Sequence, residues 1–265
     1  MGMKASKVAF LCAAVASILL GGCNLIHGGG GDTDGVHPAA GVSAVVIGVE
    51  RSAMFGNCPG AESGSKRMHK ILSAYTKDAV LLQNANATVD KVCDAISRGI
   101  ENGTDLFILY YAGHGGSQRF ADTGDDEVDG KDEFLCLYDN YLLDNDIWEL
   151  IGESNSRVFL IFDCCHSQTM YRAVPKTKRK ALGKKGKVVA RGFSMLCWSA
   201  CADDKESFTA TGGGKFTNAI IDAYDKDRTY NEMWKALKAD GKLKKHEAIQ
   251  RTELGLSFGG KKVFK

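Results

Sequence analysis

Apolar and polar positions follow two different periods along this chain, and the two periods predict strands and helices in turn. Continuous apolar runs with β-branched and aromatic residues occupy 42–49, 104–111, 158–162 and 193–198. Runs of this kind are typical of central strands in a parallel sheet, where both faces are covered. A shorter apolar run at 79–82 predicts one more strand.

Between these runs, apolar residues recur at intervals of three and four, as on one face of a helix. The last such segment opens with Thr229 and Glu232, which have the spacing of a capping box. Alternating strands and helices predict an α/β fold, a three-layer αβα sandwich with a mainly parallel central sheet. The residues that define the helices are Met68, Ile71, Leu72 and Tyr75; Val89, Val92, Cys93, Ile96 and Ile100; those at 147–151; Phe216, Ala219, Ile220 and Ala223; and Met233, Trp234 and Leu237.

The N-terminal segment does not fit the pattern of the domain. Lys4 and Lys7 precede a 13-residue apolar stretch at 8–20, which is too short to span a bilayer and is typical of an export signal. The following Leu-Gly-Gly-Cys resembles a bacterial lipobox, in which Cys23 would receive lipid and become the mature N-terminus. Asn24 after the cysteine resembles lipoproteins that are sent on to the outer membrane. An ordinary secretory signal that contains a cysteine is the alternative.

The predicted organisation is therefore a lipoprotein signal peptide at 1–22, a tether at 23–41 and one domain at 42–265. The tether is rich in glycine, which makes a chain flexible. We expect an exported, membrane-anchored bacterial lipoprotein, with the outer membrane or the cell surface favoured.

The composition is that of an ordinary globular domain, with 44% hydrophobic and 25% charged residues in a chain of 265. A net charge of +2 implies no nucleic-acid-binding footprint. Residues 172–191 nevertheless hold nine basic residues and no acidic one. We interpret this segment as an exposed loop, with contact to anionic lipid heads as the alternative.

Seven of the nine cysteines remain after Cys12 leaves with the signal and Cys23 is lipidated. An odd number in an exported protein indicates at least one free thiol, and the sequence assigns no pairing. Cys197 and Cys201 lack the spacing and the partner pair of a zinc site.

Two of the apolar runs end in reactive residues. His114 follows the run at 104–111 in a glycine setting, and Cys165 follows the run at 158–162. Catalytic groups gather beyond the carboxyl ends of parallel strands, so a thiol and an imidazole would emerge side by side. They are the minimum apparatus of a cysteine hydrolase.

The sequences around these two residues carry a family resemblance. Tyr-Tyr-Ala-Gly-His-Gly at 110–115 and Asp-Cys-Cys-His-Ser at 163–167 resemble the His and Cys motifs of metacaspases, a branch of the caspase-like cysteine peptidases. The histidine lies about 50 residues upstream of the cysteine, as in caspases. Residues 124–133 resemble the metacaspase acidic loop, 143–147 the Asp-Asp segment after it, and 212–217 the Gly-x-Phe-Thr motif that opens a late helix.

The resemblance implies a caspase-like fold and assigns the catalytic roles. Cys165 would be the nucleophile, and His114 the base that later protonates the leaving amine. The backbone N–H groups of Gly115 and Cys165 would form the oxyanion hole. Cys164 would point the opposite way and pack in the core. A buried structural role for Cys165, and His166 as a rival base, are the alternatives.

The resemblance also implies a substrate-binding (S1) pocket lined by Asp163 and Asp144, which would select Lys or Arg at P1. This chain departs from the family at three places. Ala61 stands where a third aspartate is expected, Ala112 replaces a small hydroxyl residue, and Gln168 replaces a glycine. These departures put the shape of the pocket in doubt.

Calcium is possible but is not required for the chemistry. Asp129, Asp144 and Asn145 match positions that bind Ca²⁺ in calcium-dependent metacaspases, as the resemblance implies. Another expected ligand is Arg172, a cation where hard-oxygen coordination needs an anion. A solvated acidic loop is the alternative interpretation.

We therefore predict a cysteine endopeptidase that acts on polypeptides, cleaves after Lys or Arg and also cuts itself within 172–191. A catalytically weak interaction module and a clostripain-like peptidase are the two other hypotheses.

Overall fold

The computed structural model describes part of the chain, and the account below is confined to that part. The described residues are 41–101, 105–118, 132–152, 154, 156–165, 167, 194–201, 209–210, 212–241, 243, 249–255 and 257–265. The predicted signal peptide, the lipidation site at Cys23 and all but the last residue of the tether lie outside them. So do Asp129, His166, Gln168 and the basic segment at 172–191.

A six-stranded sheet forms the centre of the domain. Its strand order is β13-β10-β9-β5-β1-β4, and every pairing is parallel except that of β13 with β10. The mainly parallel sheet predicted from the sequence is confirmed. The strands are β1 (Val42–Gly48), β4 (Ala79–Gln83), β5 (Leu106–Ala112), β9 (Arg157–Asp163), β10 (Ser194–Ser199) and β13 (Gln250–Leu254).

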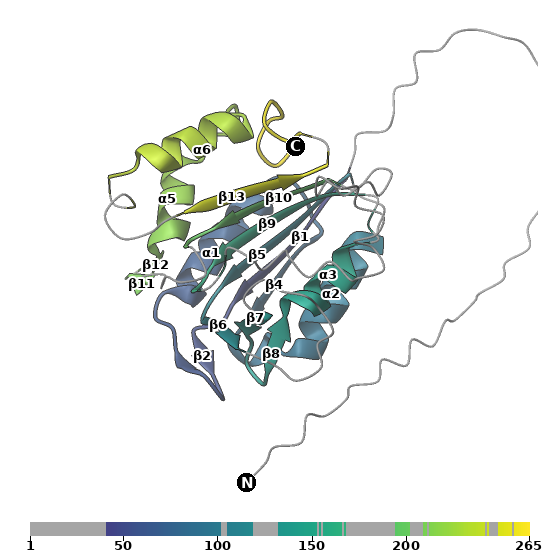
Figure 1. Cartoon of the computed structure of the whole chain (residues 1–265), viewed down its shortest axis with the longest axis vertical. Coiled ribbons are helices and arrows are strands. Elements are labelled where there is room, and N and C mark those ends of the chain that lie inside the picture. The colour runs from purple at the N-terminus through teal and green to yellow at the C-terminus, as the bar shows by residue number, and fades with distance from the viewer. Residues whose placement is uncertain are drawn as a thin grey trace, which may run out of the picture. The chain divides into compact units, whose positions relative to one another are not determined.

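Helices cover both faces of the sheet, which confirms the three-layer αβα sandwich. Figure 1 shows α2 (Val89–Glu101) and α3 (Asp144–Ile151) on one face. On the other face lie α1 (Ala61–Leu72), α5 (Lys215–Ala223) and α6 (Tyr230–Ala239). No helix among the described residues has both the length and the apolar character that a membrane span requires.

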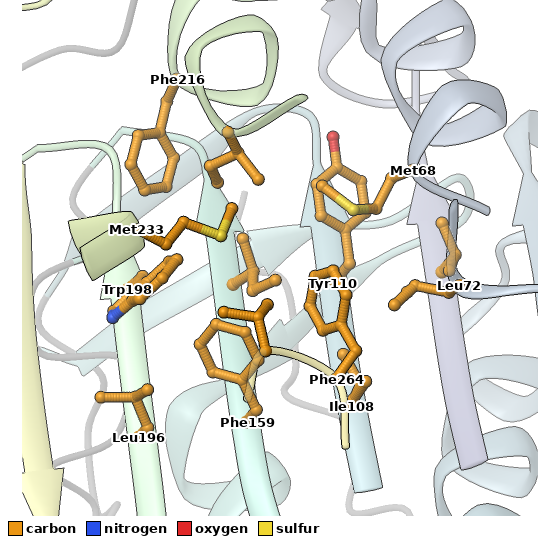
Figure 2. Close-up of a cluster of buried hydrophobic side chains, with 14 of the residues drawn as sticks. Met68, Leu72, Ile108, Tyr110, Phe159, Leu196, Trp198, Phe216, Met233 and Phe264 are labelled. Atoms are coloured by element: carbon orange, nitrogen blue, oxygen red, sulfur yellow. The ribbon is translucent and has the colours of Figure 1, made fainter. Parts of the chain in front are cut away.

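The core is divided by the sheet into two clusters, because successive side chains of a strand point to opposite faces. In β5, Tyr111 belongs to the cluster under α2 and α3, and Tyr110 to the cluster under α1, α5 and α6. Figure 2 shows the second cluster, where Phe159 meets Trp198 edge to face with ring centroids 4.9 Å apart. Both strands that carry the site, β5 and β9, are almost wholly buried and are therefore rigid supports.

Several short elements were not predicted from the sequence. A three-stranded antiparallel sheet consists of β6 (Gly115–Gln118), β7 (Asp132–Cys136) and β8 (Tyr141–Leu143). Two small pairings and one 3₁₀ turn complete the set: β2 (Arg51–Ser52) with β3 (Gly56–Asn57), β11 (Thr209–Ala210) with β12 (Gly213–Gly214), and η1 (Asn84–Asn86).

The strand order identifies where a site should lie. The chain passes from β1 outward to β4 and then returns to place β5 on the other side of β1. The connections that leave β1 and β5 therefore run to opposite sides, and in open α/β sheets sites lie beyond the carboxyl ends of such strands. The loops after β1, β5 and β9 all begin at this edge.

The capping box predicted at Thr229 is present and gives a test of local stability. The Thr229 hydroxyl accepts from the Glu232 N–H (3.3 Å), and the Glu232 carboxylate accepts from the Thr229 N–H (2.7 Å). We expect Thr229→Ala to lower the free energy of unfolding by about 1 kcal/mol and the Tm by about 2–4 °C. Thr229→Ser should retain the wild-type Tm in thermal unfolding. An alanine variant as stable as the wild type would contradict a stabilising cap.

Candidate active site

The two predicted catalytic segments leave the sheet side by side. β5 and β9 are neighbouring parallel strands, and Ala112 stands opposite Asp163 at their carboxyl ends. The Gly113 N–H donates to the Asp163 carbonyl over 3.4 Å just beyond that pair. The expectation that His114 and Cys165 emerge from adjacent strands is therefore confirmed.

Glycine is required where the two segments touch. A Cβ on Gly115 would lie 2.4 Å from the carbonyl oxygen of Cys165 and 3.1 Å from the Cys164 sulfur. Any larger residue would push the cysteine segment away. The glycine after His114 is therefore required by close packing against the cysteine segment, and the glycine before it by Tyr111, whose hydroxyl oxygen would lie 2.4 Å from a Cβ on Gly113.

The imidazole of His114 is oriented by the main chain. Its Nε2 lies 2.9 Å from the carbonyl oxygen of Asn57, at the end of β3. A carbonyl can only accept, so this contact places the hydrogen on Nε2. In the neutral ring the lone pair is then on Nδ1, which is the nitrogen left to act as a base.

A buried tyrosine holds the main chain of the same histidine. The Tyr111 hydroxyl lies 2.7 Å from the carbonyl oxygen of His114 and 2.8 Å from that of Cys136. Burial raises the pKa of Tyr111 well above its ordinary value, so the phenol keeps its proton. Since the Cys136 N–H also donates to the His114 carbonyl (3.0 Å), the loop is fixed to both β5 and β7.

Among the seven described cysteines, all of them free thiols, Cys165 differs from the rest in exposure. It is half-buried, whereas the other six are buried. Burial is the main cause that raises the pKa of Cys58 and Cys136 to about 12 and that of Cys93 to about 11. Those thiols are neutral at physiological pH, and only a thiolate is a good nucleophile.

Cys164 takes the packing position predicted for it. It is 1% exposed, belongs to the core cluster under α2 and α3, and its pKa is raised well above the ordinary thiol value, chiefly by burial. Its carbonyl accepts from the Cys201 thiol over 3.4 Å. The adjacent cysteines therefore differ in exposure, since Cys164 is buried in the core and Cys165 is half-buried.

The predicted oxyanion donor Gly115 has a suitable backbone orientation. It stands opposite Leu135 in the β6–β7 ladder, and the flanking Cys136 N–H bonds to the His114 carbonyl. In an antiparallel ladder this pattern marks a non-hydrogen-bonded pair, so the Gly115 N–H points away from β7. Its role, like that of the Cys165 N–H, stays a prediction.

Asp163, one of the two predicted S1 carboxylates, is 5% exposed and is held by Thr217 at the start of α5. Its Oδ2 accepts from the Thr217 N–H (2.9 Å) and from the Thr217 hydroxyl (2.5 Å). The Thr217 hydroxyl also lies 2.6 Å from that of Tyr110. Thr217 belongs to the motif at 212–217 and Tyr110 to the motif at 110–115, but neither motif predicted a role for these two residues.

Asp144, the other predicted S1 carboxylate, is completely buried at the first position of α3. Its Oδ1 accepts from the Asn145 N–H over 2.9 Å. α3 lies on the face of the sheet opposite to α5, so the two carboxylates approach the site from different layers. The role of Asp144 in an S1 pocket stays a prediction.

The calcium site stays a prediction, because only part of its expected ligand set falls in the described residues. No group of three or more His, Cys, Asp or Glu side chains there could hold a metal ion. Asn145 donates its amide to Asp132 over 3.3 Å. The interpretation of 124–133 as a solvated loop is wrong for Asp132 and Glu133, which are 2% and 1% exposed in β7. The rest of that acidic segment, Asp129 included, lies outside the described residues.

The family departures at Ala61 and Ala112 lie close to the site. Ala112 ends β5 opposite Asp163, and Ala61 is the buried first residue of α1. The start of α1 is capped from a distance by Glu50, which accepts from the N–H groups of Gly60 (3.1 Å) and Glu62 (3.2 Å). The carboxylate that caps this helix comes from the end of β1, a position that no local sequence pattern predicts.

Comparisons with known proteins agree with this arrangement. Residues 42–254 match the caspase domain family. Metacaspase-3 of Arabidopsis thaliana is 27% identical over a 143-residue alignment that covers 46% of this chain and 38% of that protein. The alignment thus spans well under half of the length of the plant protein.

Two solved structures share the fold. Protein GSU0716 from Geobacter sulfurreducens is 25% identical, with a TM-score of 0.65 over 84% of this chain and 98% of that one. Caspase-1 from Spodoptera frugiperda is 13% identical, with a TM-score of 0.54 over 80% of this chain and 85% of that one, and it supports the fold alone. With the caspase model matching most of the chain and the motif residues gathered at one edge of the sheet, this chain belongs to the caspase domain family of cysteine peptidases.

Proposed function

We propose that this protein is a cysteine endopeptidase that cleaves polypeptides after Lys or Arg, with Cys165 as nucleophile and His114 as general base. The observation that carries the proposal is the position of Cys165. It is the half-exposed cysteine among the described residues, it follows β9, and its carbonyl touches the glycine beside His114. Family membership supports the same reaction class.

In the proposed reaction, His114 Nδ1 takes the proton of the Cys165 thiol, and the sulfur attacks the scissile carbonyl carbon. The hydrogen bond from Nε2 to Asn57 stabilises the imidazolium that results, because the charged ring donates through both nitrogens. The carbonyl oxygen becomes an oxyanion, for which the N–H groups of Gly115 and Cys165 are the proposed donors.

Collapse of this intermediate breaks the C–N bond, and the imidazolium gives its proton to the leaving amine. An acyl-enzyme thioester remains on Cys165. Water, deprotonated by the neutral His114, then attacks the thioester carbon and releases the carboxylic acid and the free thiol. Tyr111 has no chemical step in this sequence, but its hydrogen bonds fix the main chain that carries the histidine.

The proposed preference for Lys or Arg depends on Asp163. A carboxylate that is held by hydrogen bonds in a largely dry site attracts a cation more strongly than one in water. The catalytically weak interaction module remains the competing hypothesis. It is motivated by Ala61, Ala112 and Gln168, and the absence of turnover would favour it.

The dyad can be tested by substitution, because thiolate and base act as a unit. We expect Cys165→Ala and His114→Ala each to lower kcat on a fluorogenic peptide by roughly 10⁴-fold or more. Cys164→Ala is the matched control for the adjacent cysteine and should keep most of the activity, with some loss of stability from the cavity. Turnover that survives in Cys165→Ala would exclude it as the nucleophile.

The specificity can be tested with Asp163→Asn, in which the amide oxygen can still accept from Thr217 while the charge is gone. Loss of a charge-assisted contact costs about 1.5–3 kcal/mol, so kcat/KM on an Arg substrate should fall roughly 10- to 150-fold. The Tm should change little, since the asparagine side chain keeps the hydrogen bonds from Thr217. A wild-type preference for Asp at P1, measured on peptides that differ only at that residue, would refute the pocket.

Autocleavage within 172–191 is the third expected property, since a peptidase that prefers basic P1 residues has several candidate sites there. The strands on either side of the segment, β9 and β10, are paired in parallel, so the two fragments should stay associated after the cut. Intact mass and denaturing gels of wild type beside Cys165→Ala provide the measurement. Equal cutting in both proteins would show that another protease is responsible.

A further inference from the structure

We infer that Thr217 and Tyr110 are positioning residues that orient the Asp163 carboxylate and keep it charged, and that they thereby set the selectivity for a cationic P1 residue. The inference rests on the proposed function, because it gives Asp163 the role of binding that cation. It adds two residues from other elements, α5 and β5, to the specificity site.

The hydrogen bonds define a direction. The Thr217 hydroxyl has a single hydrogen, and the Asp163 carboxylate 2.5 Å away can only accept when it is ionised. Thr217 therefore donates to Asp163 and accepts from the Tyr110 hydroxyl at 2.6 Å. The result is a chain of donors that runs from Tyr110 through Thr217 to the carboxylate, and each bond polarises the next.

A second donor fixes the same oxygen. The Thr217 N–H, in the first turn of α5, donates to Asp163 Oδ2 over 2.9 Å. Two donors on one oxygen hold the plane of the carboxylate, and the positive end of the helix adds to the attraction. Hydrogen bonds to the charged form favour that form.

Two glycines allow the neighbouring elements to pack closely around these hydrogen bonds. A Cβ on Gly214 would lie 2.1 Å from Asp163 Oδ2, so the turn before α5 closes directly over the carboxylate. In α1, a Cβ on Gly64 would lie 3.3 Å from the Thr217 methyl group and 3.5 Å from the Tyr110 hydroxyl. Figure 2 shows the Tyr110 ring held among the buried side chains of this face, which restricts its rotation.

Ala112 stands opposite Asp163 in the β5–β9 pairing and has no hydroxyl to offer it. Thr217 does offer one, and its hydroxyl contacts the carboxylate. Without the Thr217 hydroxyl, the Asp163 carboxylate should be less well oriented, and its ionised form should be less stable.

The test compares two fluorogenic peptides that differ only at P1, one with Arg and one with citrulline, its neutral isostere. We expect Thr217→Val to lower kcat/KM for the Arg peptide by about 10-fold, mainly through KM, and for the citrulline peptide by less than about 3-fold. Tyr110→Phe should act in the same direction with a smaller effect. Thr217→Ser keeps the hydroxyl and should restore the selectivity.

The controls separate orientation from stability. Tyr230→Phe removes a hydroxyl from an equally buried tyrosine, whose partner is the Phe264 N–H, and should not change the Arg-to-citrulline ratio. The single variant Thr217→Val leaves the buried Tyr110 hydroxyl without its Thr217 partner, which can destabilise the fold. The double variant Tyr110→Phe/Thr217→Val removes both hydroxyls and avoids this cost, so it remains informative if the single variant unfolds.

Equal losses on the two peptides, or an unchanged ratio in both the valine and the double variant, would overturn the inference and leave the proposed function intact. A wild-type enzyme that hydrolyses both peptides equally would instead overturn the P1 role of Asp163, and the inference with it. Failure of the wild type to cleave either peptide or any other basic-P1 substrate would refute the proposed function itself.

Discussion

The in-register parallel pairing of β5 with β9 is the constraint on which the rest of the site depends. It sets Ala112 opposite Asp163 and makes the next residues of both strands leave the sheet together. The close contact of Gly115 with the Cys165 carbonyl follows from that register. Because both strands are buried on both faces, their ends have little freedom to move apart. The segments that carry His114 and Cys165 are therefore held side by side by the two core strands that precede them.

The architecture was predictable because it depends on patterns that are local in the sequence. Long apolar runs predicted β1, β5, β9 and β10 within about two residues, and the capping box located the start of α6. β13 was missed because its sequence, Gln-Arg-Thr-Glu-Leu, is mostly polar, which an edge strand with partly exposed residues allows. The short strands β6 and β7 were missed because glycine and acidic residues are weak strand formers, and β8 because its three residues are too few to show a period.

In the candidate site, too, some features follow from local sequence patterns and others depend on the fold. Placement of His114 and Cys165 at neighbouring strand ends could be predicted from the runs that precede them. The contact of His114 with Asn57 could not, since any residue offers a backbone carbonyl and only the fold brings this one near. Tyr110 and Tyr111 did give a signal, because two phenols at the end of a buried strand must each find a partner. The sequence alone could not say that the partners would be Thr217 and the His114 carbonyl.

Those two adjacent tyrosines have a consequence for how such an enzyme can change. Tyr110 faces the layer of α1 and α5 and contacts Thr217, which holds the proposed specificity carboxylate, while Tyr111 faces the layer of α2 and α3 and contacts the main chain of His114, the proposed base. The sheet separates these two sets of contacts. Substitutions on the α5 side can therefore change which P1 residue is recognised without altering the contacts of the His114 loop. A deletion or insertion of one residue in β5 would exchange the two faces and abolish both sets of contacts at once. Selection can therefore diversify the substrates of this fold by point changes, whereas the length of β5 must stay constant.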